Sequence, residues 1–201
     1  MKTRDRIIQT AIDLFNERGM YKTSVRDISQ ILAISPGNLS YHFSRKEDLL
    51  TAILDQYRQQ NDQAYTGYFD GPPGLARYLD LVAHLLRNAY AYRGVFLGLD
   101  ELRSVLGTEY DYGAVEQKRR AFLEIILNDL EMVGDLQFVQ VGKDFIIDFL
   151  AFFQRCWIME AMISYPHLGE SDLIHRYMGF LARQFMSIST EQGQADLAIW
   201  L

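Results

Sequence analysis

The chain has 201 residues, a formal net charge of −6, and 49% apolar and 23% charged residues, which is ordinary for a soluble globular protein with one or two domains. No apolar run is long enough for a transmembrane helix, and the N-terminus lacks the apolar region of a signal peptide. A single cysteine, Cys156, excludes an internal disulfide. We therefore expect a cytoplasmic protein that does not contact a membrane.

The charge is unevenly distributed along the chain. Residues 1–50 contain eight Lys and Arg against six Asp and Glu, a balance of +2, whereas the remainder contains twelve against twenty, a balance of −8. Contact with phosphate needs a local basic surface rather than a basic protein, so the N-terminal part is the better candidate for binding nucleic acid. The alternative is that these charged residues merely lie on solvent-exposed helix faces.

The first predicted helix ends near Gly19, a residue type that often terminates helices. Its apolar face consists of Ile7, Ala11, Leu14 and Phe15. Residues 24–48 then predict two short helices joined by a tight turn at 32–34, because apolar residues recur at helical spacing over 25–32. Ser35 is a good N-cap and Pro36 suits the first helical position, so the second short helix covers 36–43. Its apolar residues are few, which suits a probe for a DNA groove better than a core element.

Three short pieces of this segment carry a family resemblance: SVRDI at 24–28, GNLSYHF at 37–43 and KEDLL at 46–50. Over residues 4–50 the chain resembles the helix-turn-helix of TetR-family transcriptional regulators. Ala33 departs from the pattern where the family usually has a turn glycine, and Ser40 departs where it often has a tyrosine. The resemblance implies a regulator, most simply a repressor, that binds palindromic double-stranded operator DNA as a homodimer and is released by a small effector.

The resemblance and the chemistry together nominate DNA-binding residues. The phosphate-side groups that the resemblance implies are Thr23, Tyr41, His42 and Lys46, and hydroxyls and an ammonium near a helix N-terminus are natural phosphate partners. The candidates for base edges are Arg26, Asn38 and Ser40, with Gly37 allowing close approach of the backbone. As alternatives, Tyr41 packs against the domain, His42 forms a hydrogen bond inside the motif, and Arg26 pairs with Asp27 or another acid.

The rest of the chain also predicts helices. A capping box over 44–47 starts a long helix that runs to residue 69, where the sequence DGPPG at 70–74 ends it. Further helices are expected at 75–92, 94–106, 114–134, 143–165 and 171–188, with a loop at 107–113 and an ambiguous piece at 136–141. The predicted fold is all-α: a three-helix DNA-binding domain at 1–48 joined to a larger helical domain at 49–201 that binds a ligand and dimerises. The long helix connects the two.

The helix at 143–165 is apolar on more than one side, so it needs more than one covering surface. As the resemblance implies, it could form a four-helix dimer interface with the helix at 171–188. The predicted interface residues are Phe149, Phe152, Cys156, Met159, Tyr177, Leu181 and Phe185. The alternative is that both helices are internal core.

The resemblance places an effector site within residues 75–201, and the many aromatic residues there favour an apolar or aromatic ligand. The candidate effector residues are His84, Arg87, Tyr90, Phe96, Asp100, Phe153 and Trp157. The alternative readings are plain core packing for the aromatic side chains and internal salt bridges for the charged ones.

Enzyme motifs are absent from the sequence: there is no GxxxxGK[ST], HExxH or GxSxG and there are no paired cysteines. The four histidines are scattered, so we expect no catalysis, no cofactor and no metal. The remaining alternative is a helical dimeric adaptor, or a constitutive DNA-binding regulator that senses no ligand.

Overall fold

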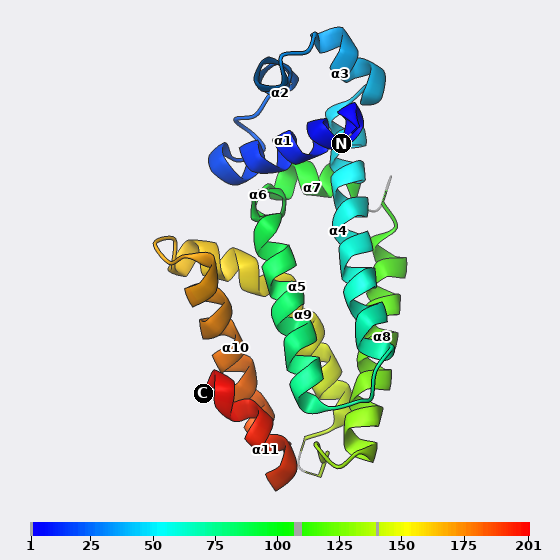
Figure 1. The fold of residues 1–201 in the computed structure, drawn as a ribbon, viewed down its shortest axis with the longest axis vertical. Coiled ribbons are helices and arrows are strands. Elements are labelled where there is room, and N and C mark those ends of the chain that lie inside the picture. The colour runs from blue at the N-terminus through cyan, green and yellow to red at the C-terminus, as the bar shows by residue number, and fades with distance from the viewer. Residues whose placement is uncertain (1, 107–109, 140) are drawn as a thin grey trace. The chain divides into compact units, whose positions relative to one another are not determined.

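The computed structural model describes residues 2–106, 110–139 and 141–201, and within them it contains eleven α-helices and one 3₁₀ turn (Figure 1). The described residues form no strand beyond two isolated bridges, which confirms the all-α prediction. None of the described helices combines the length and the apolar character needed to cross a membrane. The chain divides into two compact parts, unit 1 (Met1–Gln60 and Asn88–Gly113) and unit 2 (Asn61–Arg87 and Ala114–Leu201).

Each unit is assembled from segments that are separated in sequence. Unit 1 contains α1 (Thr3–Arg18), α2 (Val25–Leu32), α3 (Pro36–His42), the first part of α4 (Lys46–Phe69), the end of α5 (Leu75–Ala91), α6 (Arg93–Phe96) and α7 (Leu99–Val105). Unit 2 contains the rest of α4 and α5, nearly all of α8 (Tyr112–Met132), α9 (Lys143–Ser164), α10 (Glu170–Met186), α11 (Glu191–Leu197) and the 3₁₀ turn η1 (Ala198–Trp200). These compact units are not the functional domains of the sequence analysis, and the boundary between a DNA-binding domain and an effector-binding domain at residue 48 stays a prediction.

Two predictions of helix position were wrong, and one helix was not predicted. The single helix expected at 94–106 is two helices, α6 and α7, broken beside Gly98, where the backbone passes close to the Met20 side chain. The start of α4 is capped one residue later than predicted, because the Asp48 carboxylate, not Glu47, accepts hydrogen bonds from the Ser44 hydroxyl (2.6 Å) and the Arg45 N–H (3.0 Å). The sequence also gave no signal for α11, whose residues EQGQADL contain little apolar periodicity.

The loops also differ from the predictions. Residues 107–109 of the predicted loop lie outside the described residues, and α8 begins within the other end of that loop, at Tyr112. In the ambiguous piece at 136–141, Leu136 forms an isolated antiparallel bridge with Ser189, and residue 140 lies outside the described residues.

Unit 1 is held together by close backbone contact between α1 and α6. A Cβ atom at Gly94 would lie 2.2 Å from the carbonyl carbon of Phe15, so only glycine permits this approach. The Asn16 side chain completes the contact, since it donates a hydrogen bond to the Ala91 carbonyl (2.7 Å) and accepts one from the Gly94 N–H (2.8 Å). The α6 segment is therefore fixed against the helix that precedes α2 and α3.

Unit 2 has an aromatic interior and an ion-paired surface. Ring contacts join α5 to α10 through Tyr78 and Phe185 (5.9 Å between ring centroids), and α9 to α10 through Trp157 and Tyr177 (5.2 Å).

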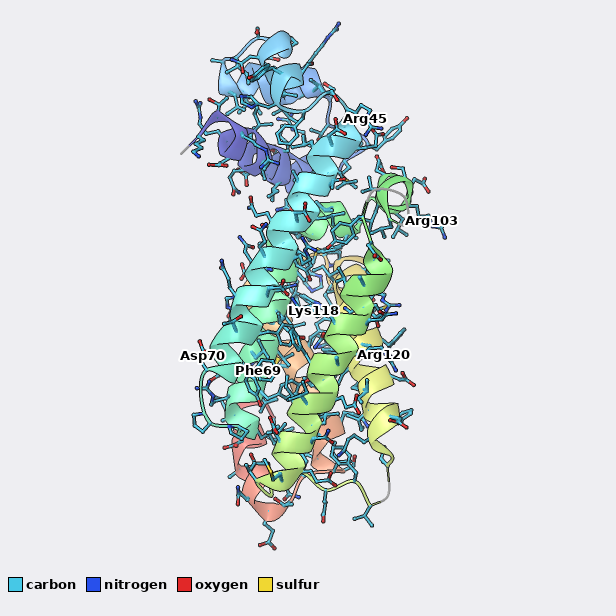
Figure 2. All side chains as sticks on the ribbon, turned by 90° about the vertical axis from the view of Figure 1, so that its right-hand side faces the viewer. Arg45, Phe69, Asp70, Arg103, Lys118 and Arg120 are labelled. Carbon is cyan, nitrogen blue, oxygen red and sulfur yellow. The ribbon has the colours of Figure 1, made fainter. Side chains whose placement is uncertain are left out.

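Ion pairs on the surface of unit 2 involve α8, where Figure 2 shows Lys118 and Arg120. Lys118 pairs with Asp62 on α4 (2.9 Å) and Arg120 with Asp148 on α9 (2.5 Å), so α8 is tied to both neighbouring helices.

Candidate nucleic-acid interface

Local caps fix the start of α2 and of α3. The Ser24 hydroxyl accepts a hydrogen bond from the Asp27 N–H (3.3 Å), and the Asp27 carboxylate accepts bonds from the Ser24 N–H (2.7 Å) and hydroxyl (2.5 Å). The bond from the Ser24 hydroxyl is the main reason why the pKa of Asp27 is lowered. At α3, the Ser35 hydroxyl accepts a bond from the Asn38 N–H (3.1 Å), as the sequence predicted.

Ala33 sets the angle between α2 and α3. It has φ 54° and ψ 40°, and among the described residues it alone, other than glycines, has positive φ. The turn is closed by hydrogen bonds from the Ala33 N–H to the Gln30 carbonyl (3.2 Å) and from the Ile34 N–H to the Ser29 carbonyl (3.0 Å). An L-residue in the left-handed region costs about 1–2 kcal/mol, so the alanine keeps the conformation of the expected glycine at some expense in stability.

The outward surface of α3 is small, polar and exposed. Gly37, Asn38, Ser40 and Tyr41 are all exposed, with 85% of the Tyr41 surface accessible, whereas Leu39 on the opposite face is buried. The exposure of Tyr41 excludes the alternative that it packs against its own domain. The helix therefore presents hydrogen-bonding groups that the fold of unit 1 does not use.

His42 and Arg26 flank this surface. The half-buried His42 ring lies edge-on to Tyr41, with 5.3 Å between ring centroids. Arg26 is exposed, and the carboxylate of Asp27 is occupied by Ser24. Within the described part of the chain, Arg26 and Asp27 form no ion pair, so the guanidinium of Arg26 remains accessible.

Thr23 and Lys46 are used inside unit 1. Thr23 is buried, and its hydroxyl donates a hydrogen bond to the Gly19 carbonyl (2.9 Å). The Lys46 ammonium donates to the Met20 carbonyl (2.7 Å) and lies 3.9 Å from the Glu101 carboxylate. Both side chains hold the connection between α1 and α2, a structural role that the sequence did not indicate.

The sequence analysis did not nominate three exposed cations of unit 1, two in the first turns of α1 and one in the connection between α1 and α2. The guanidinium carbon of Arg4 lies 5.1 Å from the ring centroid of Phe43, the residue that ends α3. Arg4, Arg6 and Lys22 are exposed, and among the described residues they form no ion pair. The excess of Lys and Arg in residues 1–50 indicated that such cations exist, but only the fold places Arg4 against the end of α3.

The seven predicted effector residues do not form one cluster. Tyr90, Phe96 and Asp100 belong to unit 1 and the other four to unit 2. His84, Arg87 and Asp100 are exposed, because each lies on the outer face of its helix rather than towards an apolar interior. Tyr90 stacks under the Arg93 guanidinium (4.4 Å) and Phe96 packs on Tyr57 (5.0 Å). The half-buried Phe153 and the buried Trp157 lie in the interior of unit 2, near Tyr177.

The predicted dimer residues divide into two groups. Phe149, Cys156 and Met159 are half-buried on α9 and Phe152 is 64% exposed, in line with the exposed Phe145 and Ile163. Tyr177, Leu181 and Phe185 on α10 are at most 4% exposed, because they form the core of unit 2 with Trp157 and Tyr78. These three side chains have no surface left to bury against a second copy.

The chain is similar to known regulatory proteins. Residues 7–53 match the family described as bacterial regulatory proteins, tetR family. Over 145 residues the chain is 25% identical to the HTH-type transcriptional regulator AcrR of Shigella flexneri. The matched segment is 71% of this chain but only 56% of AcrR. A crystal structure of a TetR-family transcriptional regulator from Marinobacter aquaeolei VT8 superposes with a TM-score of 0.84 at 24% identity, covering 100% of this chain and 98% of the other. The ketosteroid transcriptional regulator KstR2 of Mycobacterium tuberculosis superposes with a TM-score of 0.70 at 21% identity, covering 94% and 96%.

Proposed function

We propose that this chain is a member of the TetR family of bacterial regulatory proteins, a cytoplasmic repressor that binds palindromic operator DNA as a homodimer and releases it when a small effector binds. The observation that carries the DNA-binding part is the exposed polar face of α3. The major groove is about 12 Å wide and admits an α-helix, and a two-fold dimer places two such helices about one DNA turn apart. The operator is therefore proposed to be a palindrome.

The proposed contacts follow from exposure and chemistry. Arg26, Asn38 and Ser40 present donors and acceptors suited to base edges, and Gly37 allows the backbone to come close. Tyr41, His42 and Arg4 are proposed to contact phosphates on either side of the groove. Thr23 and Lys46 stay candidates for phosphate contact, although their side chains already form hydrogen bonds within unit 1.

The proposed dimer interface is the apolar stripe of α9. Its members recur every three or four residues and remain partly or fully exposed in the single chain: Phe145, Phe149, Phe152, Cys156, Met159 and Ile163. Phe180 of α10, 45% exposed, extends the apolar surface available from that helix. A face of this composition favours pairing with the same face of a second copy. Analytical ultracentrifugation of a Phe152→Glu variant should show monomers where the unaltered chain forms dimers.

The effector is proposed to bind unit 2. KstR2, one of the structurally similar proteins, is named as a ketosteroid regulator, and α4 and α5 each contribute residues to both units, so each provides a covalent path from a ligand in unit 2 to unit 1. Effector and operator binding would then oppose each other by a coupling free energy of about 1–3 kcal/mol. A regulator that senses no ligand would show no such coupling.

The DNA-binding proposal is tested by selecting bound duplexes from a random pool and titrating the selected site at several salt concentrations. Arg4→Ala should flatten the plot of log binding constant against log salt concentration by about one unit, because one phosphate contact is lost. Arg103→Ala removes the same charge from exposed α7 and serves as the matched control. Failure to enrich any duplex would overturn the proposal, and equal slopes for both variants would remove Arg4 from the interface.

A further inference from the structure

Buried aromatic side chains of unit 2, among them Tyr78, Trp157 and Tyr177, carry polar atoms that have no hydrogen-bond partner among the described residues. Tyr78, Trp157 and Tyr177 are 0%, 3% and 4% exposed. Among the described residues, nothing forms a hydrogen bond with the hydroxyl oxygens of the two tyrosines or with the indole nitrogen of the tryptophan. Folded proteins pair nearly all buried polar groups, because an unpaired one has lost its hydrogen bonds to water. Phenylalanine would fill the same space as either tyrosine without that loss, so the hydroxyls point to a partner from outside the chain.

These atoms come from three helices that meet in the interior of unit 2. The Trp157 ring on α9 contacts the Tyr177 ring on α10, and the Tyr78 ring on α5 contacts the Phe185 ring on α10. Tyr177 and Phe185 share the buried face of α10 and lie eight residues apart, which is about 12 Å along a helix. The unpaired groups therefore mark two positions along one interior strip, one beside Trp157 and Tyr177 and the other beside Tyr78.

The chemistry of these groups defines what they can bind. An indole N–H can only donate a hydrogen bond, and a protonated tyrosine hydroxyl donates one. Burial raises the pKa of Tyr78 well above its usual value, so this hydroxyl stays protonated. All three side chains are uncharged, which leaves an ionic ligand without a countercharge among them. The strip is thus suited to acceptor oxygens on an apolar, neutral molecule.

We propose that the interior of unit 2 binds an uncharged, largely apolar molecule whose carbonyl oxygens accept hydrogen bonds from Trp157 and Tyr177 at one end and from Tyr78 at the other. This inference rests on the proposed effector role of unit 2 and gives that effector a chemical class. A hydrocarbon would leave the donors unpaired, and a carboxylate would find no cation among these three side chains.

Fluorescence of Trp157 provides the direct test. A Trp200→Phe chain retains Trp157 as its only tryptophan, because the protein has two. The neutral probes are dodecane-2,11-dione, whose carbonyl groups are separated by about the length of the strip, and the aromatic ketone octanophenone. Dodecane and dodecanedioate are the matched hydrocarbon and anion. We expect a ketone to change the Trp157 emission saturably and to bind at least about tenfold more tightly than dodecane or dodecanedioate.

Tyrosine variants assign the contacts. In the same Trp200→Phe chain, Tyr78→Phe and Tyr177→Phe should each weaken ketone binding about fivefold to tenfold and leave dodecane binding unchanged, since each removes one donor and no ring. Tyr165→Phe is the control, because this half-buried hydroxyl on the connection after α9 already accepts a hydrogen bond from Arg176 (2.5 Å). A melting curve of each variant establishes that it folds.

Several outcomes would overturn the proposal. Binding of dodecane as tightly as the dione would show that apolar contact alone decides affinity, and unchanged ketone affinity in both tyrosine variants would show that the hydroxyls bind only buried water. A lack of saturable binding by either ketone would also refute it. All these titrations are made without DNA, so they leave the operator-binding result untouched, and a chain that binds a ketone but no duplex would refute only the proposed function.

Discussion

The helices of the motif in unit 1 and the helix α5 are capped in different ways. In unit 1, α2, α3 and α4 are capped by side chains three or four residues away, through Ser24, Ser35 and Asp48. In unit 2, the N-terminus of α5 is capped by carboxylates that are distant in sequence: Asp135 accepts from the Leu75 N–H (2.8 Å) across 60 residues, and Asp196 accepts from the Ala76 N–H (3.1 Å) across 120 residues. Unit 1 therefore uses local caps for the helices of the motif, whereas α5 needs the assembled unit.

The two units also differ in where their unpaired polar groups lie. In unit 1, unpaired groups are mainly on the surface, where Arg4, Arg26 and the outer face of α3 are exposed, although the Thr51 hydroxyl is buried and unpaired. In unit 2 they include the buried donors of Tyr78, Trp157 and Tyr177. A surface that keeps its polar groups open suits a large polar partner such as DNA, and an interior that keeps them open suits a small molecule.

The largest expected effect concerns the close backbone contact between α1 and α6 in unit 1. Gly94→Ala should destabilise the protein by about 3 kcal/mol or more, because the new methyl group would overlap the Phe15 backbone and push α6 from α1. Urea unfolding measures the loss. Gly37→Ala is the control, since its nearest neighbour would be a side-chain oxygen at 3.9 Å. Equal stability of the two variants would mean that α6 is not packed on α1 as described.

The long-range cap of unit 2 should have the next largest effect. Asp135→Asn should cost about 1–3 kcal/mol of unfolding free energy, because one side-chain oxygen that accepts from Leu75 or from Gln192 is replaced by a donor. Chemical denaturation followed by circular dichroism gives the value. Asp80→Asn, an exposed acid on α5, is the comparison. A loss no greater than that of Asp80→Asn would show that α5 does not depend on the distant carboxylate.

A local substitution in unit 1 should have a smaller effect on the unfolding free energy, and it should stabilise the protein. Ala33→Gly should raise the unfolding free energy by about 0.5–1 kcal/mol, because relief of the left-handed strain exceeds the added entropy of the unfolded chain. The melting temperature of the variant would rise accordingly. A decrease would indicate that the side chain of Ala33 contributes contacts that outweigh its backbone strain.

The smallest effect is the pH dependence of the α4 cap. The hydrogen bond from Ser44, helped by Arg45, lowers the pKa of Asp48 from 3.8 to about 2. Because the folded-state pKa is below the unfolded one, the stabilisation is present above about pH 4 and is lost as the pH falls towards 2. Melting curves should show the unaltered chain and Asp48→Asn differing most above pH 4 and converging near pH 2. A difference independent of pH would exclude a role for the ionised carboxylate.

Much of the candidate DNA interface could be predicted from the sequence because its causes are local. The N-cap at Ser35, the proline at position 36 and the inward Leu39 fix α3 within a few residues, and the structure has each as predicted. The same reasoning did not find Arg4, because its neighbour Phe43 is 39 positions away and no spacing rule joins them.

The sequence by itself determined that the chain is helical, where most helices lie and which short helix is exposed, because periodicity, caps and prolines act over one or two turns. Tertiary structure alone decided which faces of α9 and α10 are buried, that His84 and Arg87 point outwards, and that Asp135 caps α5. These outcomes depend on which apolar helix faces pack against each other. A helix with apolar residues on several sides can bury different sides, and its neighbours in the fold decide which of them is buried.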